Sequence, residues 1–208
     1  MSNERLFKYN GHMIKRDPES KKRQLLEAAL KEFAAHGLAG SRVDQIAERA
    51  GCSAGLVYTY FGSKDELFDA VLHFIVNETV TNIPIIPEDL PEYAGKLFDA
   101  SEQHPEVARV IMWHRLERGG TDQLIPGSID AARHKIDVIR AAQEDGRLSS
   151  RFDAEQLMIL VQSIAALWSS QPPEIAELVA AKSDHARRRA TVVEAVRQLI
   201  SKSGESTT

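Results

Sequence analysis

Residues 41–61, SRVDQIAERAGCSAGLVYTYF, hold the pattern that decides the fold. Apolar residues at helical spacing predict a short helix that begins after Ser41, with this serine as its cap. A turn at 51–53 follows, and Gly51 permits the positive φ that a sharp turn between helices needs. Ser53 caps a second short helix over about 54–60. Two short helices around a tight turn form a helix-turn-helix pattern, whose second helix can lie in the major groove of DNA.

Helices are expected on both sides of this pair. Residues 19–36 have apolar side chains at helical spacing, and Gly37 is a natural C-terminal stop. Ser63 and Glu66 form a capping box at the start of a fourth helix. Prolines make 83–91 a linker. Further helices are predicted at 92–103, 105–118, 128–145, 154–171, 174–182 and 184–201. Because no segment alternates long enough for a strand, we predict an all-α fold.

Composition and charge narrow the class of protein. The chain has 208 residues, of which 43% are hydrophobic, enough for one sizeable core or for two joined domains. Its single cysteine, Cys52, excludes an internal disulfide and a multi-cysteine zinc site. The net charge is -4, yet residues 1–64 hold 11 Lys and Arg against 7 Asp and Glu. This asymmetry suggests that the N-terminal part meets a polyanion. No apolar run approaches the ~20 residues of a membrane helix, so we expect a cytoplasmic protein without a membrane partner.

The order of residues over 41–68 resembles that of the tetracycline-repressor (TetR) family of transcriptional regulators. An apolar helix ends in His36-Gly37, and S-x-V-x-x-I-A-x-x-A-G-x-S-x-G-L-V-Y-x-Y-F-x-S-K-x-E-L-F follows. The resemblance implies a three-helix DNA-binding domain and a larger C-terminal helical bundle for ligand binding and dimerisation, joined by a long fourth helix. The expected divisions are an arm at 1–19, the DNA-binding domain at 20–62, the connecting helix at 63–82, the C-terminal domain at 83–202 and a tail at 203–208.

Candidate DNA contacts lie on and beside the second helix of the pair. Small residues there let the backbone approach DNA, Leu56 can touch a thymine methyl group, and the hydroxyl groups can meet phosphates or bases. Lys64, beside the free amides of a helix start, would form a phosphate clamp. The resemblance implies backbone or base contacts from Arg42, Tyr58, Tyr60 and Lys64. The predicted contact residues are Arg42, Ser53, Ala54, Gly55, Leu56, Tyr58, Thr59, Tyr60 and Lys64.

Other interpretations of these residues stay open at this stage. Tyr58, Tyr60 and Phe61 could be aromatic packing between helices, and Lys64 could be an ordinary solvated lysine. The chain also departs from the commonest family pattern, which has a lysine near Ala54 and a histidine near Thr59. Few strong hydrogen-bonding side chains therefore remain for base readout, and discrimination between DNA sequences would rest on shape and apolar contact.

The helices at 154–171 and 184–201 are apolar on more than one stripe. Such a helix must be buried on more than one side, so one face can meet the core and another a second copy of the chain. The resemblance implies that the last two long helices pair with their symmetry mates in a two-fold dimer. The alternative is a single thick core that needs no partner. The predicted interface residues are Leu157, Leu160, Val161, Ile164, Val192, Val196 and Leu199.

The middle helices would enclose a ligand cavity, as is usual in the family. Each candidate could equally be plain core. The predicted lining residues are Phe98, Met112, Trp113, Leu116, Met158, Gln162 and Trp168. No histidine pair has metal-ligand spacing, so neither a metal nor a cofactor is expected. Arg187-Arg188-Arg189 is interpreted as solvated charge on the last helix.

The resulting functional prediction is a dimeric repressor of a pseudo-palindromic double-stranded DNA operator, released by a small-molecule inducer. Two alternatives belong to other classes. One is a helical protein–protein adaptor that has lost DNA binding, and the other is an all-helical enzyme. The sequence has no ordered catalytic residues and no phosphate-binding glycine loop, so the enzyme is the weakest of the three.

Overall fold

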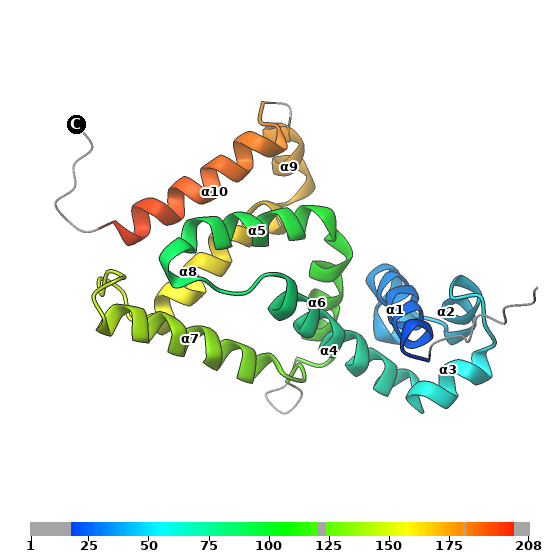
Figure 1. Ribbon diagram of the computed structural model, residues 1–208. Helices are drawn as coiled ribbons and strands as arrows, with labels where there is room; N and C mark the ends of the chain where they lie inside the picture. Colours follow the sequence, from blue (N-terminus) through cyan, green and yellow to red (C-terminus); the bar gives the residue numbers. More distant parts are fainter. Residues whose placement is uncertain (1–17, 120–123, 181, 202–208) are drawn as a thin grey trace, which may run out of the picture.

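The computed structural model describes residues 18–119, 124–180 and 182–201, and within these ranges the chain forms helices and no strand (Figure 1). Of the predicted arm at 1–19, only Pro18 and Glu19 are described, and both begin the first helix; the predicted tail at 203–208 lies outside the described residues. The elements in chain order are α1 (Pro18–Gly40), α2 (Val43–Arg49), α3 (Ala54–Phe61), α4 (Lys64–Asn82), η1 (Pro87–Asp89), α5 (Leu90–Gln103), α6 (Pro105–Glu117), α7 (Ser128–Glu144), α8 (Ala154–Ala166), η2 (Trp168–Ser170), α9 (Pro173–Ala180) and α10 (His185–Ile200). No helix of the described ranges is long and apolar enough to cross a bilayer.

Serine side chains cap two helix starts as predicted, but not the start of α2. Ser53 Oγ accepts the amide of Leu56 at 3.3 Å, and Ser63 Oγ accepts the amide of Glu66 at 3.1 Å. The prediction that Ser41 caps α2 is wrong. Its hydroxyl donates to the carbonyl of Leu38 at 2.9 Å and so serves the end of α1, while α2 starts without a side-chain cap.

Gly37 breaks α1 rather than ending it. Its backbone angles, φ 68° and ψ -175°, lie in a region that glycine alone occupies readily. The chain then continues in helical turns to Gly40, four residues beyond the expected end at His36. The kink therefore redirects the last turn of α1 toward α2 and exposes backbone amides that a continuous helix would have bonded internally.

α8 is shorter than the predicted 154–171. The α-helix ends at Ala166, and the next residues tighten into the 3₁₀ turn η2. The hydroxyl groups of Ser169 and Ser170 donate to the carbonyls of Ala166 and Leu167, at 3.0 and 2.9 Å. Serine hydroxyls compete in this way for helix carbonyls, and the last turn of a helix is often 3₁₀.

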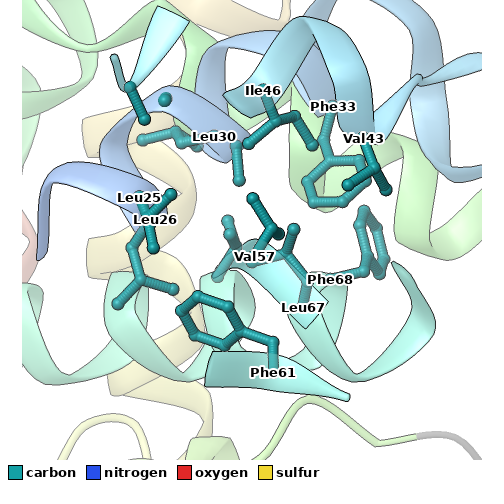
Figure 2. Packing of buried hydrophobic residues seen from close by; sticks show 14 of the residues in the cluster. Leu25, Leu26, Leu30, Phe33, Val43, Ile46, Val57, Phe61, Leu67 and Phe68 are labelled. Atoms are coloured by element: carbon teal, nitrogen blue, oxygen red, sulfur yellow. The ribbon is translucent and has the colours of Figure 1, made fainter. Parts of the chain in front are cut away.

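The buried residues form two hydrophobic cores. The first is formed by α1, α2, α3 and α4, together with Val110 of α6 (Figure 2). The second joins α5, α7, α8 and α10. Figure 1 shows α1–α3 grouped at one end, the helices of the second core at the other, and α4 and α6 between them. Because α6 packs along α1 and contributes to the first core, the first three helices are not an isolated unit.

α10 docks onto α5 through ion pairs. Arg188 pairs with Glu102, and Arg189 pairs with Glu92 at 2.6 Å and Asp99 at 2.8 Å. Both hydrogen-bonded carboxylates raise the pKa of the Arg189 guanidinium above its usual value. The interpretation of these two arginines as solvated charge is therefore wrong, because they lie on the stripe of α10 that faces α5.

Candidate nucleic-acid interface

α3 has one buried face and one exposed face. Val57, 2% exposed, and Phe61 point into the first core and fix the rotation of the helix (Figure 2). On the other side Tyr58 is 48% exposed, beside exposed Gly55 and Thr59. Tyr58 therefore points to solvent. A helix that reads DNA needs such outward side chains on the face that enters the groove.

The remaining predicted contact residues differ in how free they are. Ser53 is exposed, but its side-chain oxygen is occupied as the cap of α3. The Thr59 hydroxyl donates to the carbonyl of Gly55 at 2.8 Å and keeps its lone pairs for a donor. Arg42 is exposed at the start of α2, with Asp44 4.0 Å away as a weak partner. Three predicted contact residues, Ala54, Leu56 and Tyr60, are half-buried.

Two side chains of α1 position α2, a role that the sequence does not reveal. Lys21 Nζ donates to the carbonyl of Ala50 at 2.6 Å and so caps the C-terminal end of α2, before the turn. Glu32, 3% exposed, accepts the amide of Arg42 at 3.3 Å and lies 3.9 Å from the guanidinium of Arg49. A carboxylate one turn after buried Ala28 is a detectable signal, because charged residues in a buried stripe are rarely unpaired.

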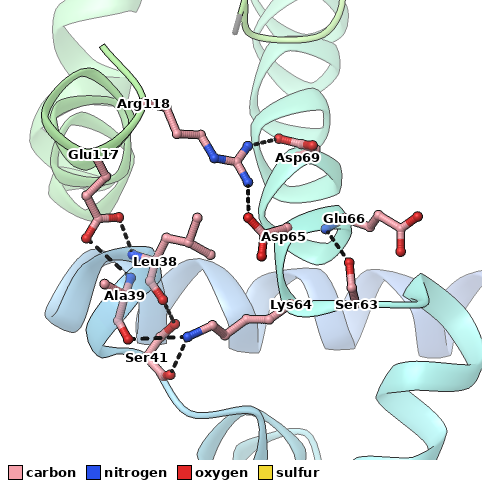
Figure 3. Close-up of polar contacts among 10 residues, drawn as sticks. All are labelled: Leu38, Ala39, Ser41, Ser63, Lys64, Asp65, Glu66, Asp69, Glu117 and Arg118. Carbon is pink, nitrogen blue, oxygen red and sulfur yellow. Dashed lines mark hydrogen bonds and ion pairs between the residues drawn. The ribbon is translucent and has the colours of Figure 1, made fainter. Parts of the chain in front are cut away.

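Lys64 is engaged inside the protein. Its ammonium donates to the carbonyls of Ala39 and Ser41, at 3.3 and 3.1 Å (Figure 3). It therefore ties the start of α4 to the segment that leads from α1 into α2. The predicted phosphate contact remains a prediction, and the structure adds a positioning role that the sequence did not reveal.

The same segment is held from the opposite side by α6. The Glu117 carboxylate accepts the amides of Leu38 and Ala39, at 2.7 and 3.3 Å (Figure 3). These are the amides that the kink at Gly37 leaves without helical partners. Arg109 and Trp113 donate from α6 to the carbonyl of Ala34, at 3.0 and 3.3 Å. The end of α6 thus fits into the kink and fixes the direction in which the chain enters α2.

Arg118, next to Glu117, connects α6 to α4. Its guanidinium pairs with Asp65 at 2.9 Å and with Asp69 (Figure 3). It also lies over the ring of Phe68, 5.0 Å from the centroid. Its side chain is mostly buried. We call Glu117 and Arg118 the α6 latch. Through it one helix end contacts both the α1–α2 connection and the first turns of α4.

The predicted ligand-lining residues are not brought together. Phe98 is buried in the second core, and Met158 and Trp168 pack against that core. Gln162 is half-buried. Trp113 instead faces α1 through its bond to Ala34, while Met112 and Leu116 are exposed. The prediction that Trp113, Met112 and Leu116 line an interior cavity with the other candidates is therefore wrong. The helical spacing indicated buried faces but not which neighbouring helix each face would meet.

Two hollows open on the surface of the described residues. One, of about 470 Å³, follows the flank of α7 that includes Ala132 and Ile136 and ends at Glu155. The other, of about 320 Å³, lies between the end of α5, α6 and Ser169, and Met112 lines it. No described group of three or more His, Cys, Asp or Glu is placed to hold a metal ion.

Several predicted dimer residues belong to the protomer's own core. Leu157 and Val161 of α8, and Val192 and Val196 of α10, are buried in the second core. The prediction is wrong for these four, because a residue already covered by its own chain offers no surface to a partner. Leu160, Ile164 and Leu199 are half-buried, and the large apolar side chains that α8 and the residue after it expose are Ile159 and Leu167.

Comparison with known proteins finds two family models that match this chain. A family model described as "Bacterial regulatory proteins, tetR family" matches residues 25–71, from α1 into α4. A second, described as "Tetracyclin repressor-like, C-terminal domain", matches residues 89–198, from η1 into α10. The two matches cover both cores.

Individual relatives agree with the family models. The HTH-type transcriptional repressor SCO4008 of Streptomyces coelicolor is 33% identical over 175 residues, which cover 83% of this chain and 90% of that protein. The HTH-type transcriptional repressor NicS of Pseudomonas putida is 25% identical and covers 75% of this chain and 79% of its own. The crystal structure of SCO4942, from Streptomyces coelicolor, has a TM-score of 0.76 at 37% identity, covering 86% of this chain and 98% of that chain. The chain therefore belongs to the tetracycline-repressor family and is a DNA-binding transcriptional repressor rather than an enzyme.

Proposed function

We propose that the chain acts in the cytoplasm as a two-fold dimer on a pseudo-palindromic operator and leaves the DNA when a small molecule binds its C-terminal domain. Proteins of this family bind DNA operators and act as dimers. The observation that carries the proposal is the outward face of α3, where Tyr58 is free of the core that holds Val57. The proposed division is a DNA-binding domain at 20–62, a connecting helix at 63–82 and a C-terminal domain at 83–202.

The proposed DNA contacts are of two kinds. Tyr58 and Thr59, with the exposed backbone at Gly55, would face the groove, and Arg42 would reach a phosphate at its rim. Lys64, whose ammonium donates to the carbonyls of Ala39 and Ser41, would reach a phosphate with its third N–H. The contact set remains the one predicted, with Ser53, Ala54, Leu56 and Tyr60 supporting the helix start and its inner edge.

We place the dimer contact on the exposed side of α8 and the neighbouring side of α10. Ile159 is 59% exposed, and Ser163 and Ala166 follow it on the same stripe. Exposed Ala195, one turn before half-buried Leu199, offers a small side chain on α10, which contacts α8. Apolar and small residues at helical spacing allow two helices to approach closely, and a two-fold axis repeats the contact. Half-buried Leu160, Ile164 and Leu199 would border it.

The α6 latch supplies a route from the C-terminal domain to DNA. A ligand that moves α6 would pull on the α1–α2 connection through Glu117 and on α4 through Arg118. Either movement changes the separation of the two α3 helices in a dimer, which must match half-sites about 34 Å apart. Release requires that the ligand bind the non-DNA form more tightly, and DNA must then weaken ligand binding by the same factor.

The test is a gel-shift titration on DNA from upstream of the chain's own gene, at several salt concentrations. The wild-type chain should bind this DNA specifically, with affinity that falls steeply as salt rises. Tyr58→Ala should weaken specific binding about tenfold per half-site with an unchanged melting temperature, since a hydrogen bond to a charged group contributes about 1.5 kcal/mol. Arg42→Ala should lower the slope of log K against log salt by about one per protomer.

Arg187→Ala is the matched control, because Arg187 is an exposed arginine on α10, away from α3. It should leave both affinity and slope unchanged. If Tyr58→Ala and Arg187→Ala behave alike, the proposed face of α3 is wrong. If the wild-type chain binds upstream DNA no better than unrelated DNA, the operator assignment fails.

A further inference from the structure

α2 depends on other elements for the capping of its ends. Its flanking residues are Arg42, whose side chain has no hydrogen-bond acceptor, and Ala50, whose side chain is apolar. A helix of 7 residues has first amides and last carbonyls that find no partner within the helix itself. The groups that bond these amides and carbonyls from outside therefore determine how firmly α2 is held.

Both ends of α2 receive a charged partner from α1. Buried Glu32 accepts the amide of Arg42 at 3.3 Å. Half-buried Lys21 donates to the carbonyl of Ala50 at 2.6 Å. Each charge has the favourable sign, because the N-terminal end of a helix carries a partial positive charge and the C-terminal end a partial negative charge. One helix thus caps both ends of its neighbour.

The spacing of the two residues along α1 matches the length of α2. Lys21 and Glu32 are about three helical turns apart, so they lie on one stripe of α1, before its kink at Gly37. Their separation along the axis is about 16 Å, and the path from Arg42 to Ala50 along α2 is about 12 Å. The two side chains therefore reach opposite ends of α2 from one face of α1. We call Lys21 and Glu32 the α1 bracket.

The orientation of α2 in turn sets that of α3. The turn that follows Ala50 leads directly to Ser53, the cap of α3, and α2 packs against α3. The buried side chains of α2 are Val43, Ile46 and Ala47. Because this apolar contact is small, the charged bonds at the two ends of α2 fix the angle at which α3 presents its outward face.

We propose that Lys21 and Glu32 are positioning residues for operator recognition, which hold α2 and α3 at the angle for specific DNA binding without contacting DNA themselves. This inference rests on the proposed function, because it takes the outward face of α3 as the reading surface. A chain without the α1 bracket populates arrangements that do not fit the operator, and its apparent affinity falls with the population of the fitting one. Non-specific binding, which depends on phosphate contacts, is maintained.

Operator titrations at several salt concentrations test the proposal on the full chain. Lys21→Met should weaken operator binding about tenfold per half-site, since a hydrogen bond to a charged group contributes about 1.5 kcal/mol. Its affinity for unrelated DNA and its slope of log K against log salt should keep their wild-type values, because this ammonium meets no phosphate. Lys21→Arg, which still reaches the carbonyl of Ala50, should restore operator affinity. Lys31→Met, which removes an exposed cation from another stripe of α1, should leave operator affinity unchanged.

Hydrogen exchange of the DNA-free protein, followed by NMR, measures the other half of the α1 bracket. Glu32→Leu removes the acceptor of the Arg42 amide, so exchange at this amide should accelerate about tenfold while the amides of α4 stay protected. Glu32→Gln keeps an acceptor oxygen and should keep the amide protected. Glu32→Leu should also lose operator affinity, and Glu32→Gln should retain most of it.

The outcomes separate this inference from the function on which it rests. A salt slope that falls by about one per protomer in Lys21→Met would make this lysine a phosphate contact and overturn the proposal. Unchanged operator affinity in Lys21→Met, an equal loss in Lys31→Met, or an Arg42 amide that stays protected in Glu32→Leu would each overturn it as well. In all these cases the wild-type chain still binds its operator. If the wild-type chain binds no operator, the proposed function itself fails.

Discussion

Gly37→Ala is expected to lower the free energy of unfolding by about 3 kcal/mol, from backbone strain and overpacking together. A Cβ at this position would lie 2.6 Å from Glu117 Oε1 and 2.8 Å from the ring of Trp113. The backbone angles of Gly37 are also ones that alanine rarely adopts. Urea denaturation followed by circular dichroism measures the loss, and operator affinity should fall with it because α2 and α3 follow this kink.

Substitutions at two other glycines separate the effect of backbone strain from that of overpacking. Gly51 has φ +59° but open space around its would-be Cβ, so Gly51→Ala should show backbone strain alone, about 1 kcal/mol. Gly40 has ordinary backbone angles and a first neighbour, His36 Cβ, at 3.5 Å, so Gly40→Ala should be nearly neutral. If Gly37→Ala costs no more than Gly51→Ala, the end of α6 does not occupy the kink tightly, and the latch geometry is wrong.

Ile159→Glu is expected to convert the dimer to monomers and to weaken operator binding about 100-fold. Burying an unpaired carboxylate in an interface costs several kcal/mol, and the two-fold axis adds the charge twice. Because Ile159 is exposed in the protomer, folding of each chain should be almost unaffected. Sedimentation velocity at micromolar concentration gives the assembly state, and thermal unfolding gives the stability.

Leu116→Glu is the matched control for this substitution. Leu116 is 70% exposed on α6, and the same carboxylate there should leave the sedimentation coefficient and the operator affinity unchanged. A dimer that survives Ile159→Glu would remove this side of α8 from the interface. A control variant that also dissociates would place the contact on α6 instead.

Features written in short stretches of sequence could be predicted. The capping serines Ser53 and Ser63 and the inward side of α3 at Val57 depend on residues within a turn or two of each other. At Gly37 the sequence predicted the end of the helix, whereas the structure has a kink within it. Helical spacing therefore predicts which face of a helix is buried. Helical spacing does not identify the helix against which that face packs.

Features that depend on distant pairs could not be predicted in this way. Lys21 reaches Ala50, and Glu117 reaches Leu38, across 29 and 79 positions of the chain. Ser41 failed as a cap because the kink before it freed the Leu38 carbonyl that its hydroxyl now serves. On α8, residues of the protomer's own core were predicted to face a partner subunit. Helical periodicity identifies apolar faces, but it does not distinguish a core from a subunit interface.

Hydroxyl-radical footprinting of the wild-type chain on its upstream DNA, with the protein-to-DNA stoichiometry measured alongside, tests the central claim most directly. The account predicts two protomers per site and two protected segments about one helical turn, ~34 Å, apart on one face of the duplex. Tyr58→Ala should weaken both segments equally. A single protected segment at one protomer per site, or equal protection of any DNA supplied, would contradict the account.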